Sequence, residues 1–159
     1  MTTSDLRLGP LTSLVGTWAG TGRGIYPTIP TFDYREEISF VDGGVKPFLA
    51  YVQRTSAVDD GRPLHAESGY VRWTGGTAEW IIASPTGVTE AHTAQIEHID
   101  GGVEFVFRTA SMAASPTAKR VDSVERRLIV RDGELRYELH MAAVGEQHQL
   151  HLTALLRRA

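Results

Sequence analysis

The sequence predicts an all-β protein: an antiparallel up-and-down barrel of about ten strands, preceded by a short helix. Turn signals recur at regular intervals, and the segments between them, roughly 8–12 residues long, suit strands joined by hairpins. Within several segments apolar and polar residues alternate, a period of two that is typical of strands and not of helices. Because closing such a sheet into a barrel removes its exposed edges, we expect one closed domain over residues 1–159.

The turn signals are short clusters of glycine, aspartate and proline. In chain order they are Asp42–Gly44, Asp59–Pro63, Thr74–Gly76, Pro85–Gly87, Asp100–Gly102 and Arg131–Glu134. The strands expected around them cover residues 15–26, 32–41, 45–54, 64–73, 77–84, 88–98, 103–109, 120–130, 134–144 and 148–157. A short helix is expected from Pro10 to Val15, and the turn-rich segment Ala110–Lys119 is expected to form the only sizeable loop.

Three of the expected strands alternate most regularly. Their apolar sides consist of Phe32, Tyr34, Ile38 and Phe40, of Val103, Phe105 and Phe107, and of Leu135, Tyr137, Leu139, Met141 and Ala143. The opposite sides are mostly polar or charged, so we expect the apolar sides to face the core. A barrel of eight or more strands is wide enough to enclose a ligand.

Composition narrows the function. Hydrophobic residues make up 42% and charged residues 22% of the chain, and the net charge of -3 offers no basic surface for nucleic acid. The chain has no cysteine, which excludes disulfides, thiolate nucleophiles and iron–sulfur clusters and leaves histidine, methionine and carboxylates as metal ligands. No stretch approaches the ~18 apolar residues of a membrane helix, and no signal peptide is evident. We therefore expect a soluble, cytoplasmic protein that binds neither nucleic acid nor membranes.

The stretch GTWAGTGRGIYPT, Gly16–Thr28, is unusually rich in glycine. Its G-x-G-x-G spacing, followed by Pro27, does not suit a phosphate-binding loop, which leads into a helix. On a strand, one face would carry Gly16, Trp18, Gly20, Gly22, Gly24 and Tyr26. Two interpretations are open: a sharply bent strand that closes the barrel with Trp18 plugging one end, or a face cleared for a flat ligand.

This glycine-rich stretch also carries a family resemblance. GTWAGTG matches the G-x-W-x-G-x-G signature of the nitrobindin family, and further blocks follow in the family's order. These blocks are GIYPTI (Gly24–Ile29), LHAESGY (Leu64–Tyr70), Ala118–Lys119 and HLTALLRR (His151–Arg158). The chain thus resembles the nitrobindins over nearly its whole length.

The resemblance implies a ten-stranded antiparallel barrel of the calycin type, similar to fatty-acid-binding proteins, that binds one haem b per subunit. It further implies an enzyme, a peroxynitrite isomerase that converts peroxynitrite to nitrate at a ferric haem. Nitric oxide is a second ligand implied by the family, which leaves a role as a sensor open. The sequence contains no cluster of acid–base residues, so no catalytic residue is expected beyond the haem iron.

The resemblance also assigns site residues. It makes His151 the axial ligand of the iron, places His65 on the distal side of the haem, and places Thr28 and Lys119 at the haem edge. A cationic Lys119 suits a propionate. For His65 and Lys119 the alternative interpretation, an ordinary exposed residue with no role in the site, stays open. Met141 is either part of the pocket wall or part of the core.

The direction of His151 depends on the last hairpin. If residues 145–147 form a three-residue loop, His151 lies opposite Met141 and joins the apolar side. A loop one residue shorter or longer turns His151 outward and puts Leu150, Leu152, Ala154 and Leu156 inside. Hydrophobic matching mildly favours the second register, whereas the resemblance implies the first. His148 and His151, three apart on a strand, point to opposite faces and do not share a metal.

An alternative from another class is a metal-free carrier of a fatty acid or another apolar small molecule in the same barrel. A hydrolase does not fit, because the chain lacks G-x-S-x-G, cysteine and a histidine metal motif of usable spacing. A homodimer formed through an exposed strand face is compatible with the sequence.

Overall fold

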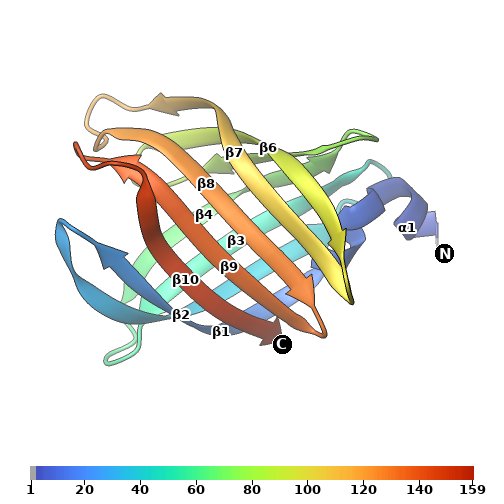
Figure 1. The fold of residues 1–159 in the computed structure, drawn as a ribbon, viewed down its shortest axis with the longest axis horizontal. Coiled ribbons are helices and arrows are strands. Elements are labelled where there is room, and N and C mark those ends of the chain that lie inside the picture. The colour runs from blue at the N-terminus through green and yellow to red at the C-terminus, as the bar shows by residue number, and fades with distance from the viewer. Residues whose placement is uncertain (1–2) are drawn as a thin grey trace.

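A short helical segment precedes the barrel. In the computed structural model, which describes residues 3–159, α1 (Thr3–Leu8) continues into the 3-10 helix η1 (Gly9–Leu14). The helix expected from Pro10 to Val15 is therefore present as η1, and α1 precedes it. Figure 1 shows α1 at one end of the barrel. Leu8, Leu11 and Leu14 of this segment are completely buried.

Within the described residues, ten antiparallel strands form a closed barrel in which each strand pairs with its neighbours in sequence and β1 pairs with β10 (Figure 1). The strands are β1 (Gly16–Tyr26), β2 (Ile29–Asp42), β3 (Phe48–Ala57), β4 (Pro63–Trp73), β5 (Ala78–Ala83), β6 (Val88–Ile99), β7 (Gly102–Ala114), β8 (Val121–Arg131), β9 (Glu134–Ala143) and β10 (Gln149–Arg158). This confirms the predicted all-β barrel and its strand order.

Three of the expected strands have wrong bounds. β2 begins at Ile29 rather than at residue 32, β3 spans Phe48–Ala57 rather than residues 45–54, and β7 is longer than expected. The loop expected over Ala110–Lys119 is shorter, because β7 continues to Ala114. The end of β7 pairs with the start of β6, with Ala113 opposite Thr89 and Ala114 opposite Val88. The small residues that end β7 show no apolar alternation, so pairing with β6 rather than a local pattern extends this strand.

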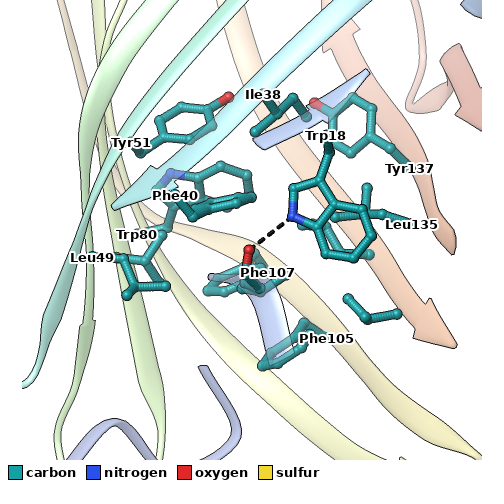
Figure 2. Packing of buried hydrophobic residues seen from close by; sticks show 14 of the residues in the cluster. Trp18, Ile38, Phe40, Leu49, Tyr51, Trp80, Phe105, Phe107, Leu135 and Tyr137 are labelled. Carbon is teal, nitrogen blue, oxygen red and sulfur yellow. Dashed lines mark hydrogen bonds between the residues drawn. The ribbon is translucent and has the colours of Figure 1, made fainter. Parts of the chain in front are cut away.

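An aromatic core fills the end of the barrel next to the helices (Figure 2). Trp18 is completely buried, and its Nε1 donates a hydrogen bond of 2.8 Å to the carbonyl oxygen of Leu14. The ring of Trp80 meets those of Tyr51 and Phe107 edge to face, with centroids 4.7 and 5.0 Å away. This end of the barrel is therefore closed.

The glycines of β1 are needed for close packing within the wall. A Cβ at Gly20 would lie 2.1 Å from the carbonyl oxygen of Leu155, and one at Gly22 would lie 2.4 Å from the ring of Tyr34. The space above Gly24 is likewise filled by the ring of Phe32. The geometry thus supports the tightly curved closing strand, and it leaves no room for a flat ligand over these glycines.

Candidate functional site

The interior is hollow at the end of the barrel away from the helices. A cavity of about 930 Å³ lies there, and its lining includes the first residues of β2 and residues of the β3–β4 and β5–β6 connections. Apolar side chains form much of its wall, contributed by Val88, Val121, Val124, Leu139, Met141 and Leu152. His65 from β4 and His151 from β10 line the same cavity.

His151 lies at an irregularity in the last strand. β10 pairs with β9 as Leu150 opposite His140 and then as Leu152 opposite Leu139, so the register shifts by one residue at His151. The register implied by the resemblance is wrong, because Met141 lies opposite Gln149 rather than His151. From Leu152 onward β10 follows the alternative register, in which Leu152, Ala154 and Leu156 face inward. The bulge re-aims the extra residue. As a result, His151 and Leu152 both line the cavity.

The surroundings of His151 determine its tautomer. Its Nδ1 lies 3.3 Å from the carbonyl oxygen of Ile25, and a carbonyl only accepts, so Nδ1 carries the proton and Nε2 keeps a free lone pair. The ring packs edge to face against Tyr26, with centroids 5.1 Å apart. Burial lowers the pKa of His151. The neutral imidazole with an oriented Nδ1–H is the form in which histidine binds a metal.

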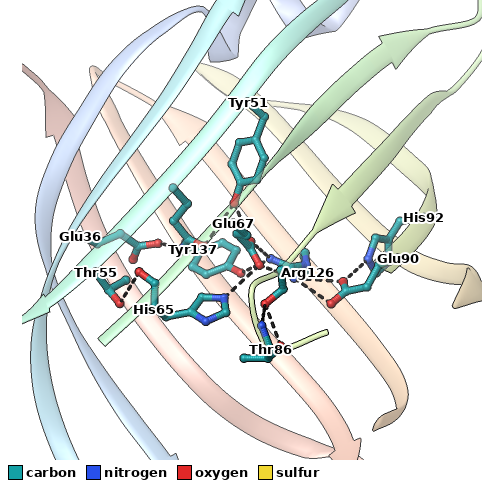
Figure 3. A network of polar contacts seen from close by, with 12 residues as sticks. Glu36, Tyr51, Thr55, His65, Glu67, Thr86, Glu90, His92, Arg126 and Tyr137 are labelled. Carbon is teal, nitrogen blue, oxygen red and sulfur yellow. Dashed lines mark hydrogen bonds and ion pairs between the residues drawn. The ribbon is translucent and has the colours of Figure 1, made fainter. Parts of the chain in front are cut away.

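The floor of the cavity is a buried network of charged and polar side chains (Figure 3). Arg126 of β8 is almost completely buried between Glu67 of β4 and Glu90 of β6. Its Nη1 donates to Oε1 of Glu67 at 2.5 Å, and its Nη2 donates to Oε2 of Glu90 at 3.0 Å. Such a buried ion pair requires close hydrogen bonds to offset the cost of removing the charges from water.

The same network reaches His65. Its Nε2 lies 3.3 Å from Oε2 of Glu67, while the hydroxyl of Tyr51 donates to Oε1 of Glu67 at 2.6 Å. Burial by itself would raise the pKa of Glu67, but the charge of Arg126 and hydrogen bonds from His65 and Arg126 outweigh it. The pKa of Glu67 therefore lies far below its usual value, and the carboxylate is ionised.

A third buried glutamate behaves differently. Glu36 of β2 accepts a hydrogen bond from the side-chain amide of Gln53, but burial dominates and raises the pKa of Glu36 to about 7. For Glu90, as for Glu67, the charge of Arg126 overcomes burial and lowers the pKa. The floor therefore holds two ionised carboxylates against one guanidinium.

Comparison with known proteins identifies the fold. A family model described as "THAP4-like, heme-binding beta-barrel domain" matches residues 7–158. The chain belongs to this family, the nitrobindins. Peroxynitrite isomerase 1 of Mycolicibacterium paratuberculosis is 45% identical over 152 residues, covering 95% of this chain and 94% of that protein. The peroxynitrite isomerase of Nocardia farcinica is 46% identical over 152 residues, covering 95% and 90%.

A solved structure supports the same relationship. The crystal structure of Rv2717c from M. tuberculosis matches with a TM-score of 0.90 and 41% sequence identity, covering 100% of this chain and 99% of that one. Separately, none of the helices in the described part of the chain has the length and apolar character needed to cross a membrane.

The cavity brings together three of the five site residues expected from the sequence. His65, Met141 and His151 line it, whereas Thr28 and Lys119 do not. Thr28 is exposed in the turn between β1 and β2, and Lys119 is exposed in the loop between β7 and β8. Both connections lie at the open end of the barrel, because every second hairpin returns there.

The charged floor was not predicted, although the sequence carried a signal for it. Glu36 stands between Tyr34 and Ile38 on the apolar side of its strand, and Arg126 stands between Val124 and Leu128. Charged residues at inward positions of an alternating strand require buried partners. Because those partners come from other strands, the pattern alone does not show which residues they are.

The cavity residues fit the haem named in the family description. His151 provides one nitrogen with a free lone pair, and the surrounding wall is largely apolar. Among residues 3–159, no group of three or more histidine or carboxylate side chains is placed to hold a metal ion. A single imidazole suits an iron whose other ligands come from a porphyrin better than it suits a free ion, which usually takes three or four protein ligands.

Proposed function

We propose that this nitrobindin-family protein binds one haem b, with His151 as the axial ligand, and isomerises peroxynitrite to nitrate. The observation that carries the proposal is the state of His151: a neutral imidazole, oriented by the carbonyl of Ile25, whose Nε2 is free beside a largely apolar cavity. The family's haem-binding description and the names of the relatives support the same function.

Each part of the cavity has a role in this proposal. The carbonyl of Ile25 holds His151 in one tautomer and increases the basicity of its Nε2. Met141 and Leu152 contribute to the apolar wall, which excludes water from the bound ring. His65 offers a polar group from another wall, and Thr28 and Lys119 at the open end are proposed contacts for the haem edge. A bound ferric haem supplies Lewis-acid chemistry at its iron.

Nitric oxide binding belongs to the same proposal. If His151 holds the haem as its one protein ligand, the rest of the cavity would admit a small ligand, whether peroxynitrite or nitric oxide. A sensor role would use the same cavity and the same histidine.

The charges of the floor disfavour the alternative of a fatty-acid carrier. The buried cation Arg126 is already paired with both Glu67 and Glu90. The carboxylate of a fatty acid would therefore meet an excess of negative charge there, without a free partner. We propose haem binding and not fatty-acid transport for this cavity.

The test is a titration of the purified protein with hemin. We expect a Soret band that is lost or strongly shifted in His151→Ala, because the axial nitrogen is removed. His148→Ala is the matched control, since exposed His148 does not line the cavity and bonds Ser123 instead. The loaded protein should increase nitrate yield from peroxynitrite and protect free tyrosine from nitration. Unchanged hemin binding and spectrum in His151→Ala would refute the proposal.

A further inference from the structure

The cavity contains a second histidine that does not share the environment of His151. His65 is on β4 and His151 is on β10, and β1, β2 and β3 lie between these strands on the shorter way round the barrel. Both imidazoles line the same cavity. Two histidines facing one haem are able to bind the iron from both sides, which would leave no position for a substrate.

His65 differs from His151 in which nitrogen is engaged. In His151, Nδ1 is bonded and Nε2 is free, whereas in His65 it is Nε2 that lies 3.3 Å from a carboxylate oxygen of Glu67. An ionised carboxylate only accepts hydrogen bonds, so Nε2 of His65 carries a proton. The nitrogen farthest from the backbone is thereby occupied and is not a ligand in this state.

Glu67 is itself held in place from several directions. Oε1 accepts hydrogen bonds from Tyr51 and from Nη1 of Arg126, and Oε2 lies 3.2 Å from Nη2 of the same guanidinium. Arg126 is held in turn by Glu90 and by the hydroxyl of Tyr137, 3.0 Å from Nη1. Glu67 is only 3% exposed, so its carboxylate is unable to follow His65 if the imidazole swings into the cavity.

We propose that Glu67 is a positioning residue that holds His65 away from the haem iron and so keeps one axial position available. The inference rests on the proposed function, in which His151 binds the haem. It assigns a purpose to the buried network: Arg126 fixes Glu67, Glu67 fixes His65, and His65 stays beside the ligand space as a hydrogen-bonding group.

The charges of the floor make this inference testable by substitution. Glu67→Leu removes one of the two carboxylates that contact Arg126 and leaves a one-to-one pair with Glu90, so no net charge is stranded. The hydroxyl of Tyr51 still has Oε1 of Gln53 at 3.3 Å. Circular dichroism and thermal unfolding establish that the variant is folded before its haem is examined.

The first experiment compares the ferric spectra of the haem-loaded proteins by absorption and electron paramagnetic resonance. The parent protein should be high-spin, and Glu67→Leu should shift towards a low-spin spectrum with two imidazole ligands. Glu67→Leu combined with His65→Leu should return to high-spin. Glu90→Gln, which also leaves Arg126 with one carboxylate but does not touch His65, should remain high-spin.

A second experiment needs no haem and uses Glu67→Gln, which preserves side-chain size. The hydrogen bonds to Oε1 from Tyr51 and Arg126, 2.6 and 2.5 Å, are shorter than those to Oε2 from Arg126 and His65, 3.2 and 3.3 Å. The amide oxygen of the substituted side chain should therefore take the Oε1 position, and its NH₂ should face His65. Nitrogen NMR of labelled histidine should then show that Nε2 of His65 is protonated in the parent protein and loses that proton in the variant. An unprotonated Nε2 in the parent protein would overturn the proposal.

The outcomes separate this inference from the proposed function. A folded Glu67→Leu that stays high-spin shows that Glu67 does not restrain His65, whereas haem binding by His151 is unaffected. A parent protein that is already low-spin, and becomes high-spin on His65→Leu, also contradicts the restraint alone. Only a Soret band that is insensitive to His151→Ala contradicts the proposed function itself.

Discussion

At the scale of single residues, the floor of the cavity shows that the surroundings decide the charge of a buried glutamate. Glu67 and Glu36 are both almost fully buried. Arg126 contacts Glu67 directly and keeps its pKa far below the usual value. Glu36 is bonded to the neutral amide of Gln53, and burial raises its pKa to about 7. The same side chain is thus an anion at one position and an acid near neutrality at the other.

Glu36 should make the stability of the protein depend on pH. Its folded pKa of about 7 exceeds the ordinary value of 4.5 expected in the unfolded chain. The folded state therefore binds the proton of Glu36 more tightly than the unfolded chain does. The resulting stabilisation of the fold is complete at a pH below 4.5, and it is lost as the pH rises through the folded-state pKa of about 7. The loss is about 3 kcal/mol. Glu36→Gln removes the titrating group and should remove this pH dependence. The stability of the variant relative to the parent protein should therefore increase between about pH 5 and about pH 8.

Urea unfolding of both proteins across this range measures the effect. Glu37→Gln is the control, because Glu37 is the exposed neighbour on the same strand. Parallel pH profiles for the parent protein and Glu36→Gln would show that Glu36 is ionised in the folded state throughout.

At the scale of the elements, the glycines of β1 carry no side chain, and this allows atoms of the neighbouring strands β2 and β10 to approach β1 closely. The main-chain oxygen of Leu155 on β10 occupies the position that a Cβ at Gly20 would need. A main-chain atom moves only if the strand moves, so relief of this clash would disturb the pairing that closes the barrel.

Gly20→Ala should therefore destabilise the protein by ~1–3 kcal/mol, the usual cost of overpacking. Gly76→Ala is the matched control, because a Cβ there meets nothing within 4 Å and the substitution should change stability by less than about 0.5 kcal/mol. Denaturant unfolding gives both values. Equal effects of the two substitutions would show that the wall relaxes around Gly20 at no cost.

At the scale of the whole molecule, the two ends of the barrel have different tasks. The helical segment and the aromatic residues around Trp18 close one end, and the cavity opens at the other. The charged floor lies between them. Stability from the closed end and ligand binding at the open end should consequently respond to different substitutions.

Leu11→Ala tests this separation. Leu11 is completely buried in η1, and its truncation should cost ~2–5 kcal/mol of unfolding free energy. Hemin affinity, measured by titration where the variant is still folded, should stay at the parent value. Leu6→Ala is the control for stability, since Leu6 is 72% exposed. A folded Leu11→Ala with weakened hemin binding would show that the two ends are coupled.

The strands were predictable because their signals are local. Glycine and aspartate at the turns, and alternation along Phe32–Phe40 and Leu135–Ala143, arise from a few neighbouring residues and set the length and faces of each strand. The candidate site was predictable only in part. The family resemblance singled out His151, but its direction depends on a bulge that adds one residue to β10, and no hydrophobic pattern marks that position.

The sequence alone was sufficient to predict the barrel, the order of its strands and the family, because each of these depends on short patterns of neighbouring residues. Only the tertiary structure decided which nitrogen of His151 is free. The carbonyl of Ile25 that engages the other nitrogen belongs to β1, and β1 becomes the neighbour of β10 only when the barrel closes. The tertiary structure also decided the charges of the floor. Glu67, Glu90 and Arg126 come from three different strands, and a buried charge takes its state from the partners that folding places beside it.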